Sequence, residues 1–231
     1  MNLPNALTVG RIAITPLVAV LPFVSGSTVR GIAFLLFIIA AVTDYVDGYL
    51  ARRENLITDL GKWLDPLADK LLLLGTFVPM YYLMRGAGAP MLQQAAQSLP
   101  PAGRFPTLLA SMWLSLPLWV VLVVLGREAF MTGFRELAKR RGIVISSIGP
   151  AKWKTTFQSV WIGSAYCWFF TATLARERGW GGNWWSAFAQ FNGAVLAVSM
   201  FCAVALTLWS LGLYVQRYGS VIAAPARGHA G

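Results

Sequence analysis

The sequence predicts an all-α integral membrane protein with six transmembrane helices in one domain, residues 1–231. Hydrophobic residues make up 57% of the chain and charged residues only 12%, whereas about a quarter of a soluble domain is charged. Six stretches approach the roughly 20 apolar residues that a membrane-spanning helix needs. Cys167 and Cys202 lie inside two of these stretches, so we expect no disulfide framework.

The six spans follow one another with short polar connections and no internal repeat. They are Leu7–Val24, Ile32–Leu50, Trp63–Met84, Leu108–Ala138, Thr155–Leu174 and Ala187–Tyr214. The first follows Pro4 and Asn5 and is compatible with an interfacial start. The fourth exceeds the thickness of the bilayer core, so its part from Arg127 onward is expected to project into the headgroups. The Gly- and Pro-rich segment 85–106 reads as an irregular loop, and Gly179–Trp185 as an interfacial aromatic turn.

Basic residues set the orientation. The net charge is +10, but the basic residues form no continuous stripe, so we exclude a nucleic acid partner and expect an anionic membrane surface instead. Ten lie in Arg52–Lys62, Lys139–Lys154 and the C-terminal tail, against five on the opposite side. This bias predicts cytoplasmic termini. The N-terminus lacks a basic region and a cleavage site, and we interpret it as the start of the mature protein. A bacterial inner membrane is the expected location, with a mitochondrial one left open.

Four of the nine acidic residues gather at the edges of two predicted spans. Asp44 and Asp47 share one face near the end of the second span, and Asp65 and Asp69 share one face at the start of the third. A short turn joins these helices, so the pairs can face each other. Four converging carboxylates repel unless a cation lies between them. Oxygen ligands favour Mg²⁺ or Mn²⁺, and the sequence leaves the choice between them open.

The same segment carries a motif of eight residues. Its first part is Asp44-x-x-Asp47-Gly48-x-x-Ala51-Arg52. A spacer of eight residues follows, and the second part is Gly61-x-x-x-Asp65-x-x-x-Asp69. This motif resembles the signature of the CDP-alcohol phosphatidyltransferases at every defined position. The resemblance implies that family's membrane fold of six helices, and often a homodimer.

The resemblance also implies a role for each motif residue. Asp44, Asp47 and Asp65 would be ligands of a centre with two metal ions, and Asp69 both a ligand and the general base. The CDP-binding residues would be Gly48, Ala51, Arg52 and Gly61. The donor would be CDP-diacylglycerol, and its phosphatidyl group would pass to an alcohol as CMP leaves.

Basic residues at the same end of the spans predict an anionic acceptor. Arg127 and Arg135 are eight residues apart on the fourth span, and Lys152 and Lys154 precede the fifth. Arg side chains bind phosphate groups in a bidentate manner. The alternatives are ion pairs with Glu128 and Glu136 for the two arginines, and interfacial anchoring for the two lysines.

A second resemblance narrows the acceptor. The stretch GREAFMTGFRELAKRRGIVISSIGPAKWKTTFQ and the opening NLPNALTVGRIAITP are similar to phosphatidylglycerophosphate synthases. The implied reaction joins CDP-diacylglycerol and glycerol 3-phosphate to give phosphatidylglycerol phosphate and CMP. Inositol phosphate is the nearest rival acceptor. A transporter is the competing class, but it predicts acids at the bilayer midplane and inverted repeats, which this sequence does not show.

Overall fold

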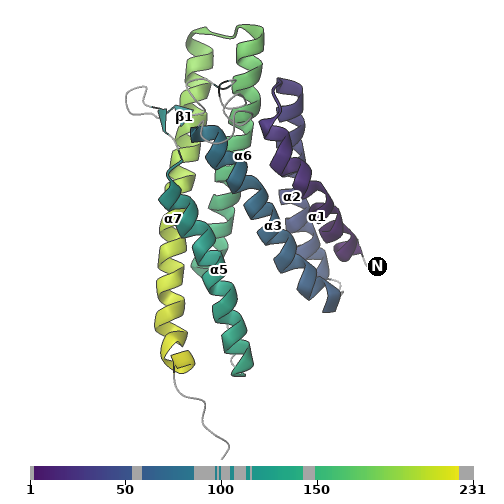
Figure 1. Cartoon of the computed structure of the whole chain (residues 1–231), viewed down its shortest axis with the longest axis vertical. Helices are drawn as coiled ribbons and strands as arrows, with labels where there is room; N and C mark the ends of the chain where they lie inside the picture. The colour runs from purple at the N-terminus through teal and green to yellow at the C-terminus, as the bar shows by residue number, and fades with distance from the viewer. Residues whose placement is uncertain are drawn as a thin grey trace, which may run out of the picture.

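The computed structural model is an elongated bundle of long helices (Figure 1). It describes residues 3–53, 59–85, 97, 99, 105–106, 113–114, 116–142 and 149–223. The helices are α1 (Leu3–Val20), the 3-10 turn η1 (Leu21–Phe23), α2 (Ser27–Arg53), α3 (Asp59–Arg85), α5 (Leu118–Arg140), α6 (Gly149–Arg178) and α7 (Gly182–Ala223). Two strands of two residues each, β1 (Phe105–Pro106) and β2 (Trp113–Leu114), pair antiparallel. The expected helical class is confirmed, with this short pair as its one departure in the described part.

Four helices in the described part are long and apolar enough to cross a membrane. They run over Asn5–Phe23, Ser27–Gly48, Trp63–Met84 and Gly182–Gly219. The helices α5 and α6 have sufficient length, but polar and charged residues keep their composition below that of a typical span. The chain is therefore a membrane protein by its helices, and the count of six spans stays a prediction.

The predicted start of the fourth span is wrong. The apolar residues from Leu108 suggested a helix, but α5 begins only at Leu118, after the strand Trp113–Leu114. Pro117 is extended at the N-cap of α5, with φ −71° and ψ 142°. A proline disfavours the helical conformation of the residue before it, so the helix cannot readily continue back through Leu116. The short pair of strands takes part of the segment that composition alone assigned to a helix.

The predicted turn Gly179–Trp185 is shorter than expected. Gly179 and Gly182 have positive φ values of 64° and 84°, which favour glycine. The helix α7 begins at Gly182, so Trp184 and Trp185 lie in its first turn. The loop predicted over 85–106 lies largely outside the described residues.

The contacts between helices close a ring in the order α1, α2, α6, α7, α5, α3 and back to α1. Small residues let two of these pairs approach closely. A β-carbon on Gly75 of α3 would lie 3.1 Å from the Thr15 methyl group of α1, and one on Gly31 of α2 would lie 3.0 Å from the Phe170 ring of α6. A buried core that includes Trp161 and Phe77 fills the interior, with these two rings packed edge to face at 4.8 Å.

Polar contacts fasten the end of the bundle at which α2 begins and α6 ends. The backbone N–H of Ser27 donates to Glu177 at 2.8 Å, and the Ser27 hydroxyl donates to the same carboxylate. These two bonds hold the pKa of Glu177 below its ordinary value. Arg30 is fully buried and donates to the Pro22 carbonyl at 3.1 Å and to the Thr173 hydroxyl at 2.5 Å. The opposite end of the bundle carries the acidic motif.

Candidate active site

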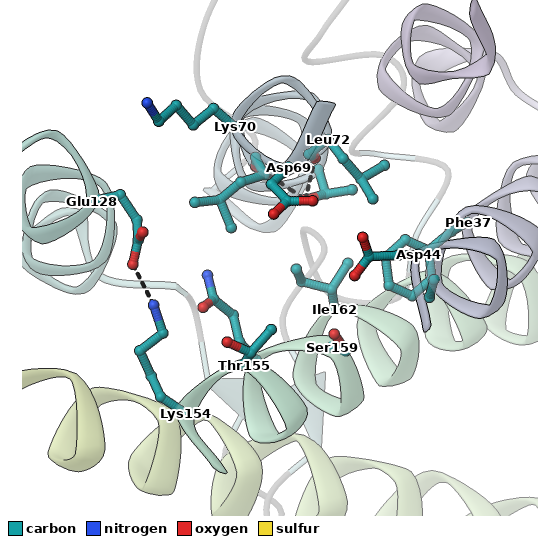
Figure 2. Close-up of a pocket in the computed structure, with 14 residues that line it drawn as sticks. Phe37, Asp44, Asp69, Lys70, Leu72, Glu128, Lys154, Thr155, Ser159 and Ile162 are labelled. Carbon is teal, nitrogen blue, oxygen red and sulfur yellow. Dashed lines mark hydrogen bonds and ion pairs between the residues drawn. The ribbon is translucent and has the colours of Figure 1, made fainter. Parts of the chain in front are cut away.

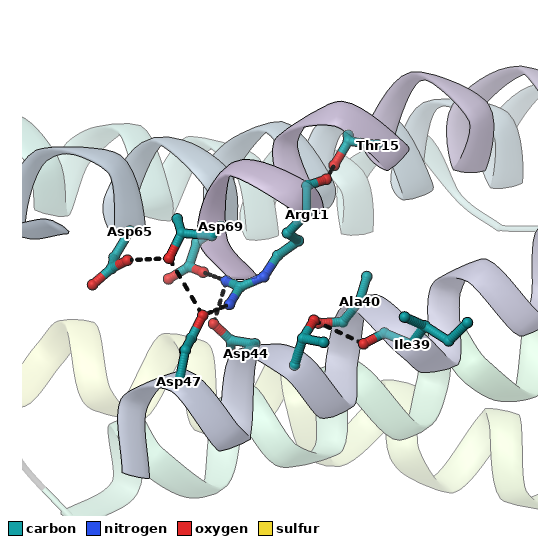
Figure 3. Close-up of polar contacts among 10 residues, drawn as sticks. Arg11, Thr15, Ile39, Ala40, Asp44, Asp47, Asp65 and Asp69 are labelled. Carbon is teal, nitrogen blue, oxygen red and sulfur yellow. Dashed lines mark hydrogen bonds and ion pairs between the residues drawn. The ribbon is translucent and has the colours of Figure 1, made fainter. Parts of the chain in front are cut away.

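Three of the four motif aspartates contact one arginine of the first helix. The Arg11 guanidinium donates through Nη1 to Asp44 and, at 3.1 Å, to Asp69, and through Nη2 to Asp47. Figure 3 shows the carboxylates of α2 and α3 on either side of this guanidinium. The predicted meeting of the two aspartate pairs is confirmed. The cation at their centre is a side chain of the protein.

Asp65 joins the cluster through a neighbouring hydroxyl. Thr8 Oγ1 lies 2.9 Å from Asp65 Oδ1 and 3.4 Å from Asp47 Oδ2. Thr8 and Arg11 belong to a buried polar face of α1 that also includes Asn5 and Thr15. The steps of three, three and four residues place these side chains on one side of the helix. This face of α1 packs toward α2 and α3 and brings the donors to the carboxylates.

The carboxylates differ in exposure. The Asp47 side chain is 7% exposed, while those of Asp44 and Asp69 are 46% and 60% exposed. The buried Asp47 is held by Arg11, which is itself 1% exposed. Burying a charge is costly unless it is paired, so Arg11 and Asp47 stabilise each other. Asp44 and Asp69 remain available to a molecule that enters the site.

The side chains of this cluster can be compared with the ligands that a divalent metal ion requires. All four acids offer oxygen, the ligand that Mg²⁺ and Mn²⁺ prefer. Arg11 supplies one positive charge to four carboxylates, so negative charge remains in excess and the donor set fits divalent cations. Within the described residues, however, no group of three or more Asp, Glu, His or Cys side chains has metal-holding geometry. Arg11 occupies the point at which the carboxylates meet.

A cavity of about 160 Å³ adjoins this cluster. Figure 2 shows Asp44 and Asp69 at one side of it and the pair of Glu128 and Lys154 at the other. One water needs only about 15 Å³ on a comparable measure, so the cavity admits a small polar molecule. Its remaining lining comes from α2, α3 and α6: Phe37, Ala41, Lys70, Leu72, Leu73, Thr76, Thr155, Gln158, Ser159 and Ile162. The cavity therefore connects an acidic wall with a wall that carries a buried lysine.

Glu128 organises the basic side of the cavity. Its Oε1 accepts a hydrogen bond from Arg127 Nη1 at 2.9 Å and forms an ion pair with Lys154 Nζ. Arg127 Nη2 also lies 3.2 Å from the Ser210 hydroxyl of α7. Arg127 and Lys154 are both buried, with side chains 6% exposed. The alternative pairing of Arg127 with Glu128 is present, but Arg127 is buried and the pair includes Lys154.

The structure separates Arg135 from this group. Its side chain is exposed, and its guanidinium carbon lies 6.0 Å from the Tyr214 ring centroid. The alternative pairing of Arg135 with Glu136 is not the one that forms, because Glu136 accepts from Arg140 at 3.2 Å. Of the acceptor cluster, Lys154 lines the cavity, whereas Arg127 and Arg135 are not among its lining residues. The side chain of Lys152 lies outside the described part.

The predicted CDP-binding residues lie on the two helices that carry the acids. Gly48 is half-buried on α2, and Gly61 is buried near the start of α3. Neither belongs to the residues that line the cavity. The side chains of Ala51 and Arg52, near the end of α2, lie outside the described residues, so the structure does not test their role.

Reasoning from sequence missed two functional residues of this site, Arg11 and Glu128. The signal for Arg11 was available, because a charge inside an apolar span is costly and calls for a partner. Its place on one face with Asn5, Thr8 and Thr15 was a second signal. Glu128 was noted only as the neighbour of Arg127. Its contact with Lys154 depends on how α5 and α6 pack, which the sequence does not reveal.

Several known proteins are similar to this chain in sequence. Over 221 residues the chain is 31% identical to a CDP-diacylglycerol–glycerol-3-phosphate 3-phosphatidyltransferase of Salmonella choleraesuis, covering 93% of each chain. A Bacillus subtilis protein of the same name is 34% identical over 171 residues, 69% of this chain and 73% of its own. A Rickettsia typhi protein of that name is 49% identical over 71 residues.

The matches differ in extent. The match to the Rickettsia typhi protein spans 31% of this chain and 40% of that protein. The sequence profile of the CDP-alcohol phosphatidyltransferases, in contrast, matches residues 1–228. That range includes the aspartate cluster, Arg11 and every helix that lines the cavity. The chain therefore belongs to the CDP-alcohol phosphatidyltransferase family.

Proposed function

We propose that the protein transfers the phosphatidyl group of CDP-diacylglycerol to glycerol 3-phosphate, giving phosphatidylglycerol phosphate and CMP. The observation that carries the proposal is the cavity between the exposed carboxylates of Asp44 and Asp69 and the buried amine of Lys154. Glycerol 3-phosphate carries a nucleophilic hydroxyl at one end and a phosphate at the other. The names of the Salmonella and Bacillus relatives support the same reaction.

Asp69 is the proposed general base. A base must reach the proton of the attacking hydroxyl, and the exposed Asp69 carboxylate lines the cavity in which that hydroxyl would lie. As the proton passes to Asp69, the hydroxyl oxygen forms a bond to the phosphorus that bears the diacylglycerol. The bond from this phosphorus to the CMP oxygen breaks, and CMP leaves. No covalent intermediate with the protein is required.

Asp44, Asp47, Asp65 and Asp69 would hold the two Mg²⁺ or Mn²⁺ ions that we propose as cofactors. When bound, such ions supply charge stabilisation for a pyrophosphate and its leaving group. The excess of carboxylates over Arg11 supports this assignment. Gly48, Ala51, Arg52 and Gly61 remain the proposed CDP contacts.

Lys154 is the best supported of the proposed acceptor contacts, because its buried amine lies in the cavity wall. Arg127 pairs with the same Glu128 as Lys154, and its positive charge would attract the acceptor phosphate from outside the cavity wall. Lys152 and Arg135 would contribute positive charge at this end of the bundle. A neutral acceptor such as serine would not need the positive charge that these residues bring to the site.

The proposed setting is a bacterial inner membrane with all six long helices spanning it. The acidic motif, Glu128 and Lys154 lie at one end of the bundle, toward which the basic segment from Lys139 also points. The positive-inside rule places this end in the cytoplasm. A homodimer is proposed from the family resemblance.

The test measures CMP release by purified protein with CDP-diacylglycerol, Mg²⁺ and glycerol 3-phosphate. We expect Asp69→Asn to lower the rate by about 100-fold or more, because a positioned base contributes that much. The matched control is Glu136→Gln, the same loss of a carboxylate at an exposed position paired with Arg140. The control should keep the rate of the unaltered protein.

Parallel reactions with inositol phosphate show which of the two acceptors the protein uses. Release with inositol phosphate but not with glycerol 3-phosphate would contradict the proposed acceptor and leave the chemistry intact. Equal rates for Asp69→Asn and Glu136→Gln would remove Asp69 as the base. Absence of release with either acceptor would contradict the proposed reaction.

A further inference from the structure

A buried amide in the cavity wall has no role in the reaction described so far. The Gln158 side chain is 6% exposed and lines the cavity. Its Nε2 has no hydrogen-bond partner among the described residues. An unpaired buried donor costs on the order of 1–3 kcal/mol, so a site rarely keeps one unless a ligand or water satisfies it. The amide therefore marks a place for an oxygen atom inside the cavity.

The position of Gln158 along α6 indicates which part of the acceptor this oxygen atom would belong to. Lys154 lies one turn before it and Ile162 one turn after it, and all three line the cavity. Four residues of helix rise about 6 Å. If the acceptor phosphate binds at Lys154 and the reacting hydroxyl at Asp69, the middle of the acceptor would face the wall to which Gln158 belongs. Thr155 and Ser159 make the same stretch of the wall polar (Figure 2).

We infer that Gln158 recognises the C2 hydroxyl of glycerol 3-phosphate, the hydroxyl that does not react. Its Nε2 donates a hydrogen bond to that hydroxyl oxygen and so selects an acceptor with a polar group between its nucleophile and its phosphate. This inference rests on the proposed function. It adds a residue that determines specificity, whereas Lys154 and Arg127 act on a phosphate that many acceptors share.

The consequence is discrimination against an acceptor without the middle hydroxyl. A pocket built to bind a substrate hydroxyl rejects the analogue that lacks it, because the buried polar group of the protein is then left unpaired. One neutral hydrogen bond corresponds to roughly a tenfold preference. The suitable probe is 3-hydroxypropyl phosphate, which keeps the reacting hydroxyl and the phosphate of glycerol 3-phosphate.

The experiment compares kcat/KM for the two acceptors in the unaltered protein and in Gln158→Met. Methionine has a similar length and cannot donate the hydrogen bond. We expect the substitution to lower kcat/KM for glycerol 3-phosphate about tenfold and to change that for 3-hydroxypropyl phosphate by less than about twofold. The matched control is Gln190→Met, the same change at an exposed position of α7. Thermal melting of both variants verifies that they are folded.

The outcomes separate this inference from the reaction itself. Unaltered protein that releases no CMP with glycerol 3-phosphate contradicts the proposed function and removes the basis of the inference. Normal release together with an equal loss for both acceptors in Gln158→Met overturns the inference alone, because a structural role or a contact to the shared phosphate predicts that result. An unchanged preference in Gln158→Met overturns it as well.

Discussion

Arg11 is the residue on which the geometry of the site depends most. It is buried, it contacts aspartates on both α2 and α3, and it is the only cation that the described residues bring into contact with three of the motif carboxylates. The aspartates carry the proposed chemistry, but without this guanidinium the buried Asp47 would lose its counter-ion. Arg11 thus has a structural role that the motif itself does not include.

Removal of Arg11 should destabilise the protein when no divalent ion is present. Breaking a buried ion pair costs about 3–5 kcal/mol, so Arg11→Gln should lower the melting temperature in chelator by on the order of 10 °C. Added Mg²⁺ should recover much of this loss, because the carboxylates regain a positive partner. The measurement is thermal melting of the detergent-solubilised protein with chelator and with Mg²⁺.

The control for Arg11 is Arg140→Gln. Arg140 also pairs with a carboxylate, but its side chain is 75% exposed, and exposed pairs contribute about 0–1 kcal/mol. If the two variants melt alike in chelator, Arg11 does not hold the cluster together. If Mg²⁺ stabilises neither the unaltered protein nor Arg11→Gln, the proposed metal ligands lose their support.

At the scale of the helices, we expect the contact between α2 and α6 to weaken at low pH. Ser27 at the start of α2 donates two hydrogen bonds to Glu177 near the end of α6, and these lower the pKa of Glu177 from its ordinary value of 4.5. A carboxylate with a depressed pKa in the folded state stabilises that state above its ordinary pKa. The contribution is lost as the pH falls through the folded-state pKa.

The substitution Glu177→Ala tests this contact. The unaltered protein should melt at a higher temperature than the variant near pH 7, and the difference should shrink as the pH falls below the ordinary carboxyl pKa of 4.5. Melting curves of both proteins across this range provide the measurement. A difference that stays constant with pH would show that the charge of Glu177 does not contribute.

The helices also show how far sequence reasoning reaches. The predicted span Trp63–Met84 falls within α3, because apolar composition and length suffice to identify a helix long enough to cross a membrane. The same reasoning placed the start of the α5 span at Leu108, because it gave too little weight to Pro117. The four aspartates were found from their spacing. Their contact with Arg11 was not, because it depends on how α1 packs against α2 and α3.

At the scale of the whole molecule, the charged site lies at one end of an elongated bundle, and the Ser27–Glu177 contact lies at the other. The long helices run along the bundle between these two ends (Figure 1). Large apolar side chains such as Phe201 and Trp209 of α7 are exposed on its outside, at 74% and 61%. Such a surface suits the lipid phase, so the two ends of the bundle should face opposite sides of the membrane.

Labelling of introduced cysteines tests this orientation. In a background with Cys167→Ala and Cys202→Ala, Lys139→Cys marks the end with the site, and Gly181→Cys, between α6 and α7, marks the opposite end. A membrane-impermeant maleimide should label Gly181→Cys in intact spheroplasts and Lys139→Cys only after lysis, as the basic residues predict. The reverse pattern would place the site outside the cytoplasm.

The position of Arg11 also constrains how the chain enters the bilayer during synthesis. An arginine inside an inserting apolar segment raises its insertion free energy, so α1 enters at a disadvantage while it is alone. The next helix to emerge carries Asp44 and Asp47, which bind the same guanidinium. Pairing of the two helices removes the isolated charge. Insertion of α1 and α2 together as a helical hairpin is therefore favoured, because the ion pairs of Arg11 with Asp44 and Asp47 hold the two helices together.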